Sequence, residues 1–451
     1  MLEEHIALLE SSKLNAVVCP RFEEARAEAD ELDRRLAAGE DDPRPLLGVP
    51  CTIKESFAVA GMPNCAGLVS RAERRATQTA SAAQRLLESG PILLGLTNTS
   101  ELTMWIESEN RVYGRTLNAY DRRRTAGGSS GGEGAAVGSG GSAIGLGTDF
   151  AGSIRLPAFY NGVFGHKPTE DLVPMTGHFP LSAGEAIRMS GVGPLARRAE
   201  DLMPMLRMLA GPDGEDARTR TVELGEPTDV PLEGLAVVLA EGASLVPVRR
   251  ELREARERAG DALAAAGATV RRVRMRSLRR ALELYLAAVQ DGAGISLAEL
   301  IAAEGGDPVT LRSTQRKGTH TRATFAVVFA ERHSRWMPSR RTRRALAAGR
   351  SLVSEVEGVI GDGILLHPPA ARVAPRHGRT VARPWTFTCT AIFNLLGLPA
   401  TQVPMGIGRR GLPLGVQAVA ARDRDHVAIA AALELERAFG GWVPPPRRSG
   451  M

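Results

Sequence analysis

Residues 126–169 constrain the fold more than any other stretch, because glycine, serine and alanine dominate them without making the segment low in complexity. Short apolar pieces at 135–137, 143–146 and 154–159 interrupt the run, as packing into a core requires. A flexible Gly/Ser linker would lack such pieces. Because so much glycine costs backbone entropy on folding, the segment must bring main chain very close to main chain or to a ligand.

Two serines in this stretch have distinctive neighbours. Ser129 stands in Gly-Gly-Ser-Ser-Gly-Gly at 127–132, and Ser153 follows 24 residues later in Asp-Phe-Ala-Gly-Ser-Ile-Arg at 149–155. Upstream, Lys54 ends the run Gly-Val-Pro-Cys-Thr-Ile-Lys. In order and spacing these motifs resemble the amidase signature family of serine hydrolases, whose pattern runs GGSSGG, a short helix, GTD-x-GGS-I-R-x-P and G-x-KPT.

The resemblance implies a set of site residues. It assigns Ser153 as the nucleophile, Ser129, held by a cis peptide, as the bridging serine, and Lys54 as the base. The remaining expected residues are the backbone amides of Phe150, Ala151, Gly152 and Ser153 as an oxyanion hole, Ser130, Asp149 and Arg155 in support, and Thr99 and Gly128 at the substrate. The resemblance implies no metal and no organic cofactor.

Lys54 is also notable apart from the resemblance, because only four of the 57 basic residues are lysines. It follows an apolar run, so we expect it to be buried with a lowered pKa, as a base at neutral pH must be. The alternative is a structural ion pair with Glu55 or another acid. For Ser129 and Ser153 the alternative is helix capping.

Ala151 departs from the glycine that the family pattern carries. If the position required a positive φ, the methyl group would strain it and slow turnover.

Strand-like and helix-like patterns alternate along the chain, which predicts an α/β fold: one domain over 1–451 with a mixed, largely parallel central sheet flanked by helices. The core motifs span 46–169. Strand, helix and strand patterns at 235–240, 246–266 and 269–275 predict a βαβ unit. Residues of about 277–360 read as a helical insertion, broken at 305–308 and near Pro338, that either covers a site or simply packs. The segment before residue 14 is short for the family.

Composition excludes several classes of protein. The net charge of +6 is carried almost wholly by arginines on mixed-charge helices without interleaved aromatic residues, so we expect no nucleic-acid partner. Four cysteines without CxxC spacing predict free thiols, and scattered histidines predict no metal site. With neither a signal peptide nor an apolar run long enough to span a membrane, we expect a cytoplasmic monomer or homodimer that acts on a small-molecule amide.

Two other sequence motifs match by their letters, but the residues around them do not fit the structure that each motif requires. Residues 127–131 fit G-x-S-x-G, but the charged run at 121–124 cannot be the buried strand that a nucleophile elbow needs. Glycine patterns at 138–143 and 191–196 match a dinucleotide fingerprint by letter only. The family's closing motifs are matched at 391–400 and 411–417, and the segments at 99–105, 159–168 and 439–442 look closest to its fatty-acid amide hydrolase branch.

The sequence therefore predicts an amidase that forms an acyl-enzyme through a Ser-cisSer-Lys triad, with a fatty-acyl amide as a possible substrate. Two alternatives stay open. One is a protein like the amidase-type component of an amidotransferase, which delivers ammonia to a charged tRNA. The other is a non-catalytic binding protein on the same fold, suggested by the short N-terminal segment and Ala151.

Overall fold

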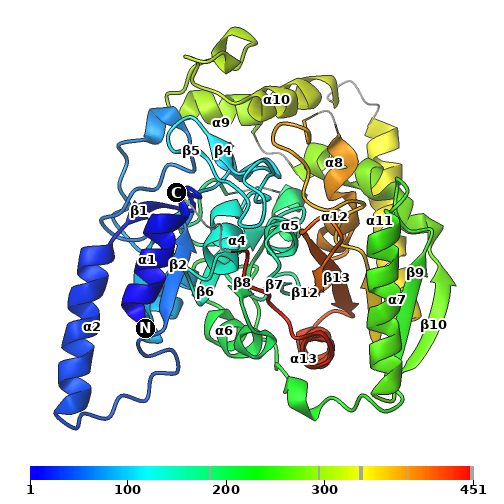
Figure 1. The fold of residues 1–451 in the computed structure, drawn as a ribbon. Coiled ribbons are helices and arrows are strands. Elements are labelled where there is room, and N and C mark those ends of the chain that lie inside the picture. The colour runs from blue at the N-terminus through cyan, green and yellow to red at the C-terminus, as the bar shows by residue number, and fades with distance from the viewer. Residues whose placement is uncertain (182–183, 293–294, 335–338, 382, 447–451) are drawn as a thin grey trace.

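A computed structural model describes residues 1–181, 184–292, 295–334, 339–381 and 383–446, which build one large sheet covered by helices (Figure 1). The sheet has 11 strands in the order β1-β3-β2-β6-β8-β7-β12-β13-β11-β9-β10. In chain order they are β1 (Val17–Pro20), β2 (Pro50–Lys54), β3 (Ile92–Thr97), β6 (Ile144–Asp149), β7 (Phe164–Lys167), β8 (Gly191–Ala196), β9 (Ala236–Glu241), β10 (Thr269–Arg274), β11 (Ile364–His367), β12 (Ala400–Ile407) and β13 (Pro413–Ala420). A separate hairpin pairs β4 (Glu109–Asn110) with β5 (Gly114–Arg115).

The sheet is mixed. Parallel pairs join β2 to β3 and β6 near one end, and β9 to β10 and β11 near the other. Between them, the neighbours from β6 through β8, β7, β12 and β13 to β11 are antiparallel. The α/β fold and the mixed sheet are confirmed, with parallel pairing concentrated in these two groups of strands.

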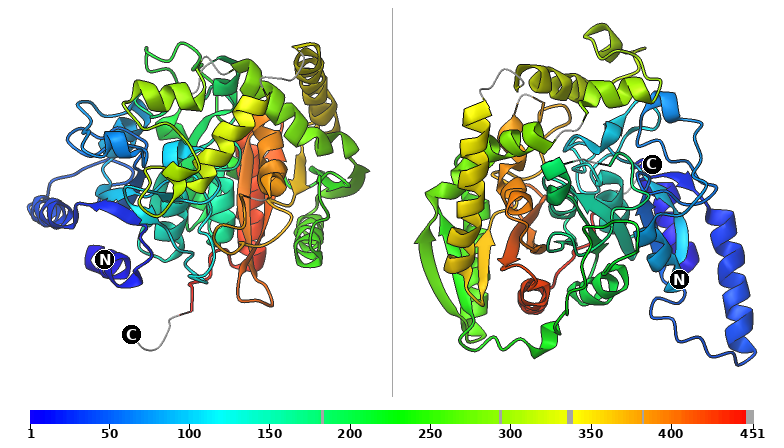
Figure 2. Two further views of the ribbon diagram at one scale, coloured as in Figure 1. Left: turned by 90° about the horizontal axis from the view of Figure 1, so that it is seen from above. Right: turned by 180° about the vertical axis from the view of Figure 1, so that it is seen from behind.

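Helices cover both faces of the sheet. The helices are α1 (Leu2–Ser12), α2 (Phe22–Ala37), α3 (Ser81–Glu88), α4 (Gly131–Gly138), α5 (Arg155–Tyr160), α6 (Leu202–Leu209), α7 (Arg250–Ala265), α8 (Ala281–Gly292), α9 (Leu297–Ala303), α10 (Arg322–Ser334), α11 (Ser339–Ile360), α12 (Thr388–Leu395) and α13 (Asp425–Phe439). In Figure 1, α4, α5 and α12 lie above the middle of the sheet and α6 and α13 below it. Seen from behind, α2 lies at one end of the sheet and β10 at the other (Figure 2). No helix in the described ranges is long and apolar enough to cross a membrane.

The βαβ unit predicted at 235–275 is present as β9, α7 and β10, with the two strands parallel. The glycine-rich centre also holds strands, β6 and β7, which pair with β8 and were not predicted. Their glycines lack the β-branched side chains that mark a strand in a sequence.

The predicted helical stretch at 277–360 consists of α8 to α11, and the break at 305–308 follows the end of α9. The second predicted break, near Pro338, lies outside the described residues. Two contacts join this stretch to the rest of the chain: Arg71 binds Glu304 at 2.7 Å and Glu101 binds His320 at 2.6 Å. Both contacts fasten it to the half of the chain that carries the motifs.

Candidate active site

Lys54 is the last residue of β2 and is completely buried. Its Nζ donates to Ser129 Oγ at 2.6 Å and to Thr148 Oγ1 at 2.7 Å. Burial lowers the pKa of Lys54 to about 7, although the nearby carboxylates of Asp149 and Glu133 act to raise it. Glu55 does not neutralise Lys54, because its carboxylate accepts the amides of Cys65 and Ala66 instead.

Ser129 lies between Lys54 and the start of α4. The Gly128–Ser129 peptide is cis, and Ser108 Oγ donates to the Ser129 carbonyl oxygen at 2.8 Å. A side chain at Gly128 would meet the backbone of residues 105–107 at 2.7 Å. Glycine is therefore required at 128 by the close approach of two main-chain segments.

Ser153 lies in the turn from β6 to α5 and is 5% exposed. Its carbonyl oxygen accepts the amide of Ser130 at 3.2 Å. Ser130 Oγ in turn donates to the Thr148 carbonyl oxygen at 3.2 Å. These contacts hold the two glycine-rich loops side by side, so the Ser153 turn lies next to the loop that carries Ser129.

Asp149 and Arg155 form a buried ion pair around the Ser153 turn. Arg155 Nε lies 3.0 Å from Asp149 Oδ2, and both side chains are completely buried. Asp149 also accepts the amides of Gly152 at 2.6 Å and Ile154 at 3.1 Å. Burial alone would raise the pKa of Asp149, but Arg155 outweighs it and holds the pKa well below its usual range. The turn is therefore fixed by a carboxylate that stays ionised.

The amide of Gly152 is thus already donated to Asp149. In the described chain, the amides of Phe150, Ala151 and Ser153 donate to no protein acceptor. The positive φ in this turn, +116°, belongs to Gly152, and Ala151 does not share it. The expected strain at Ala151 therefore does not arise, while a Cβ at Gly152 would lie 2.1 Å from Thr390 Oγ1.

A cavity of about 350 Å³ opens beside these residues. Ser129, Thr148 and Asp149 line it, and the rest of its wall is neutral and largely apolar: Thr103, Met104, Phe150, Met175, His178, Pro180 and Ser190. Burial lowers the pKa of His178 to about 3, so this wall carries no positive charge near neutral pH. Phe150 in turn packs against Tyr285 of α8, with ring centroids 5.9 Å apart.

Two sequence-predicted substrate residues lie outside that lining. Thr99 is completely buried, and its Oγ1 has no hydrogen-bond partner within the described ranges. Gly128 approaches the backbone of 105–107, as described above. Thr148 and Glu133 were missed by the sequence reasoning. Thr148 stands inside the Gly-Thr-Asp motif, and a buried acid in an apolar helix could have marked Glu133.

Three histidines and the second buried lysine have structural partners. His166 binds Thr401 and Asp425, and Lys167 donates to the Pro168 carbonyl oxygen at 2.6 Å. His367 and His377 contact backbone carbonyl oxygens at 2.7 and 3.0 Å. All four cysteines are free, and no group of three or more possible metal ligands occurs among the described residues.

The chain is similar to known proteins over most of its length. The amidase family model matches residues 2–428. Fatty-acid amide hydrolase 2-B from Danio rerio is 40% identical over 96% of this chain and 84% of its own length. A glutamyl-tRNA(Gln) amidotransferase subunit from Deinococcus deserti is 32% identical over 97% of this chain and 92% of its own.

Among solved structures, 6-aminohexanoate cyclic dimer hydrolase complexed with substrate superposes with a TM-score of 0.83. It is 26% identical, and the match covers 99% of this chain and 94% of the other. With the family model spanning most of the sequence and a 40% identical hydrolase extending over nearly all of it, this chain belongs to the amidase family and is an amide-hydrolysing enzyme.

Proposed function

We propose that the enzyme cleaves carboxylic amides through an acyl-enzyme formed on Ser153, with Lys54 and Ser129 as its proton path. The observation that carries the proposal is the contact between Lys54 Nζ and Ser129 Oγ at 2.6 Å, in a fully buried site beside the Ser153 turn. A lysine with a pKa of about 7 is neutral in a large fraction of molecules at neutral pH. Its amine can then accept the Ser129 proton.

During acylation, protons move towards Lys54 as the bond to Ser153 forms and back from Lys54 as the C–N bond breaks. As Ser153 Oγ bonds to the amide carbonyl carbon, its proton passes to Ser129 Oγ while the Ser129 proton passes to Lys54 Nζ. Ser129 then donates a proton to the departing nitrogen and recovers one from Lys54, so the C–N bond breaks and the amine leaves. Water, deprotonated by the same path, attacks the ester and releases the acid. No metal or cofactor takes part in this scheme.

The developing oxyanion would be stabilised by backbone amides. Of the four candidates, the amide of Gly152 is occupied by Asp149, so Phe150, Ala151 and Ser153 remain as donors. Each well-placed donor of this kind lowers the activation barrier by about 3–4 kcal/mol. Asp149 and Arg155 act here as positioning residues, because their ion pair and the amides that Asp149 accepts hold the turn in place.

The substrate we propose is a neutral amide with an apolar acyl group, in keeping with the similarity to a fatty-acid amide hydrolase. Supporting this, the cavity beside Ser129 is lined by Met104, Phe150 and Met175. A charged acyl group would find no opposite charge there apart from that of Asp149, which Arg155 already neutralises. The lower identity to the amidotransferase protein, 32% against 40%, makes ammonia delivery to tRNA the weaker alternative.

Fluorophosphonate labelling followed by intact-mass measurement tests the nucleophile. We expect one adduct on the wild-type protein and none on Ser153→Ala, which should also lose at least about 10⁴-fold in kcat. Ser139→Ala is a matched control, since that serine caps the end of α4 and binds the Ala136 carbonyl oxygen. An adduct that persists on Ser153→Ala would reject Ser153 as the nucleophile.

A further inference from the structure

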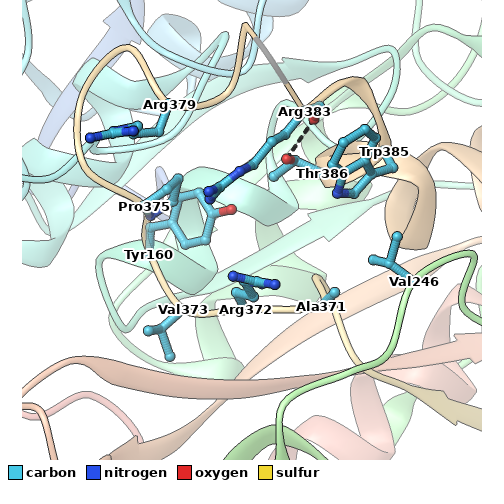
Figure 3. A pocket seen from close by; sticks show the side chains of 10 residues that line it. All are labelled: Tyr160, Val246, Ala371, Arg372, Val373, Pro375, Arg379, Arg383, Trp385 and Thr386. Atoms are coloured by element: carbon cyan, nitrogen blue, oxygen red, sulfur yellow. Dashed lines mark hydrogen bonds between the residues drawn. The ribbon is translucent and has the colours of Figure 1, made fainter.

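A second cavity, of about 380 Å³, lies away from the residues described so far (Figure 3). Its wall shares no residue with the cavity beside Ser129. We call it the arginine pocket, because Arg372, Arg379 and Arg383 line it together with Tyr160, Trp385 and apolar residues such as Val246. Tyr160 ends α5, whose first turn follows Ser153, so the two cavities flank opposite ends of one short helix.

Arg372 and Arg379 are exposed and Arg383 is half-buried, so solvent reaches the arginine pocket. Within the described part of the chain, none of the three guanidinium groups donates a hydrogen bond or forms an ion pair, and no acidic residue lines the wall. Arg124, from a neighbouring loop, is by contrast held by Asp121 and the Ala374 carbonyl oxygen. The three unpaired cations create a positive potential that an anion would neutralise.

Tyr160 adds a donor that also lacks a partner. The residue is 1% exposed, and its hydroxyl oxygen makes no hydrogen bond to any described residue. Figure 3 shows the hydroxyl group directed into the same space as the guanidinium groups of Arg372 and Arg383. A buried hydroxyl without a partner is costly, so it marks a place where a ligand acceptor fits. Burial raises the pKa of Tyr160, and the hydroxyl keeps its proton for donation.

The apolar part of the wall indicates which class of anion fits the pocket. Val246, Val373 and Trp385 lie on the same pocket, and inorganic phosphate would leave these surfaces without contact. A guanidinium group binds a carboxylate with two parallel hydrogen bonds. The guanidinium groups and the apolar side chains lie on one wall, which fits a carboxylate that carries a hydrocarbon chain.

We propose that the arginine pocket binds an amphiphilic carboxylate, with its head on Arg372, Arg383 and Tyr160 and its chain against Val246, Val373 and Trp385. This site goes beyond the proposed function, because none of its residues belongs to the catalytic scheme. A carboxylic acid released by the enzyme is one ligand of this class. Binding, however, requires no turnover, so the proposal can be tested with the catalytic serine removed.

The test is a titration of the Ser153→Ala protein with octanoate. Binding is measured by calorimetry and by tryptophan fluorescence. We expect saturable binding that changes the emission of Trp385, a change that Trp385→Phe abolishes. Arg372→Gln and Arg383→Gln should each weaken binding about 10- to 100-fold, because each removes a charge-assisted hydrogen bond. Tyr160→Phe should weaken it by a smaller factor of about 5–10.

Arg376→Gln is the matched control, since it removes the same charge from the same segment at a residue that does not line the pocket. It should leave octanoate affinity within about twofold. Octan-1-ol, which lacks the charge, should not compete. Absence of saturable binding, equal weakening by Arg376→Gln, or competition by inorganic phosphate at the same concentration would each overturn the proposal. Octanoate bound only beside Ser129 would give unchanged affinity in the arginine variants, and would overturn it as well.

Discussion

The acid–base behaviour of the enzyme depends on one residue, Lys54. Burial lowers its pKa to about 7, and the base must be neutral to accept a proton. We therefore expect kcat/KM to fall about tenfold per pH unit below pH 7 and to level off above about pH 8. A pH–rate profile on a neutral amide, with unfolding followed at the same pH values, measures this. A limb centred above pH 9 would mean that Lys54 keeps an ordinary pKa and is not the base as described.

Two adjacent residues of the Ser153 turn differ in what they tolerate. Gly152 has φ +116° and no room for a Cβ beside Thr390 Oγ1, whereas Ala151 already carries a methyl group without a positive φ. We expect Gly152→Ala to lower kcat by roughly 10²-fold, because the neighbouring amides move from their places. Ala151→Gly should change kcat by less than about threefold. Steady-state kinetics of both variants decide the matter, and a larger loss for Ala151→Gly would contradict this account of the turn.

Among the elements, the end of β6 is joined to α5, α12 and β13 by one ion pair. Arg155 binds Asp149, the Thr390 carbonyl oxygen and Asn394 of α12, and Gln417 of β13. Asp149→Asn leaves the buried guanidinium without a counter-charge, so we expect a loss of about 3–5 kcal/mol in the free energy of unfolding. Denaturant titration by fluorescence measures the loss.

The matched control for that experiment is Asp362→Asn. Asp362 also lies 3.0 Å from an arginine, Arg424, but it is 91% exposed. An exposed pair contributes about 0–1 kcal/mol. Equal losses in the two variants would show that burial does not set the strength of these pairs.

Prediction from sequence succeeded for elements with a strong local pattern. The apolar run ending at Lys54 and the βαβ unit at 235–275 were placed correctly, because burial and periodicity leave a direct mark on neighbouring residues. β6 and β7 were missed because their residues include glycines selected for close packing. The contacts of Arg155 with Asn394 and Gln417 join residues more than two hundred positions apart, and nothing in a single sequence reveals such pairs. The same holds for the arginine pocket, whose Tyr160 and Arg383 come from distant segments.

At the scale of the whole molecule, the helical stretch from α8 to α11 is joined to the motif-bearing half by Glu101. Its carboxylate contacts His320 Nδ1 at 2.6 Å and accepts the amide of Thr321 at 2.7 Å. Burial disfavours the imidazolium of His320, but the hydrogen bond with Glu101 outweighs this and raises the pKa above 6.5. The charged contact therefore stabilises the junction fully below pH 6.5, and its contribution is lost as the pH rises through the higher folded-state pKa.

His320→Gln tests this junction, because glutamine keeps a hydrogen-bond donor but cannot carry the charge. At pH 6 we expect limited proteolysis between α9 and α10 to be several-fold faster in the variant than in the wild type, since the cleaved state is reached by local opening. At a pH above the raised folded-state pKa the wild-type histidine is neutral, so the two rates should converge. His333→Gln is the control, because His333 is exposed and its contacts among the described residues are with the Phe329 carbonyl oxygen and ring of its own helix. A difference between His320→Gln and wild type that is the same at both pH values would mean that packing alone, and not charge, holds the helical stretch in place.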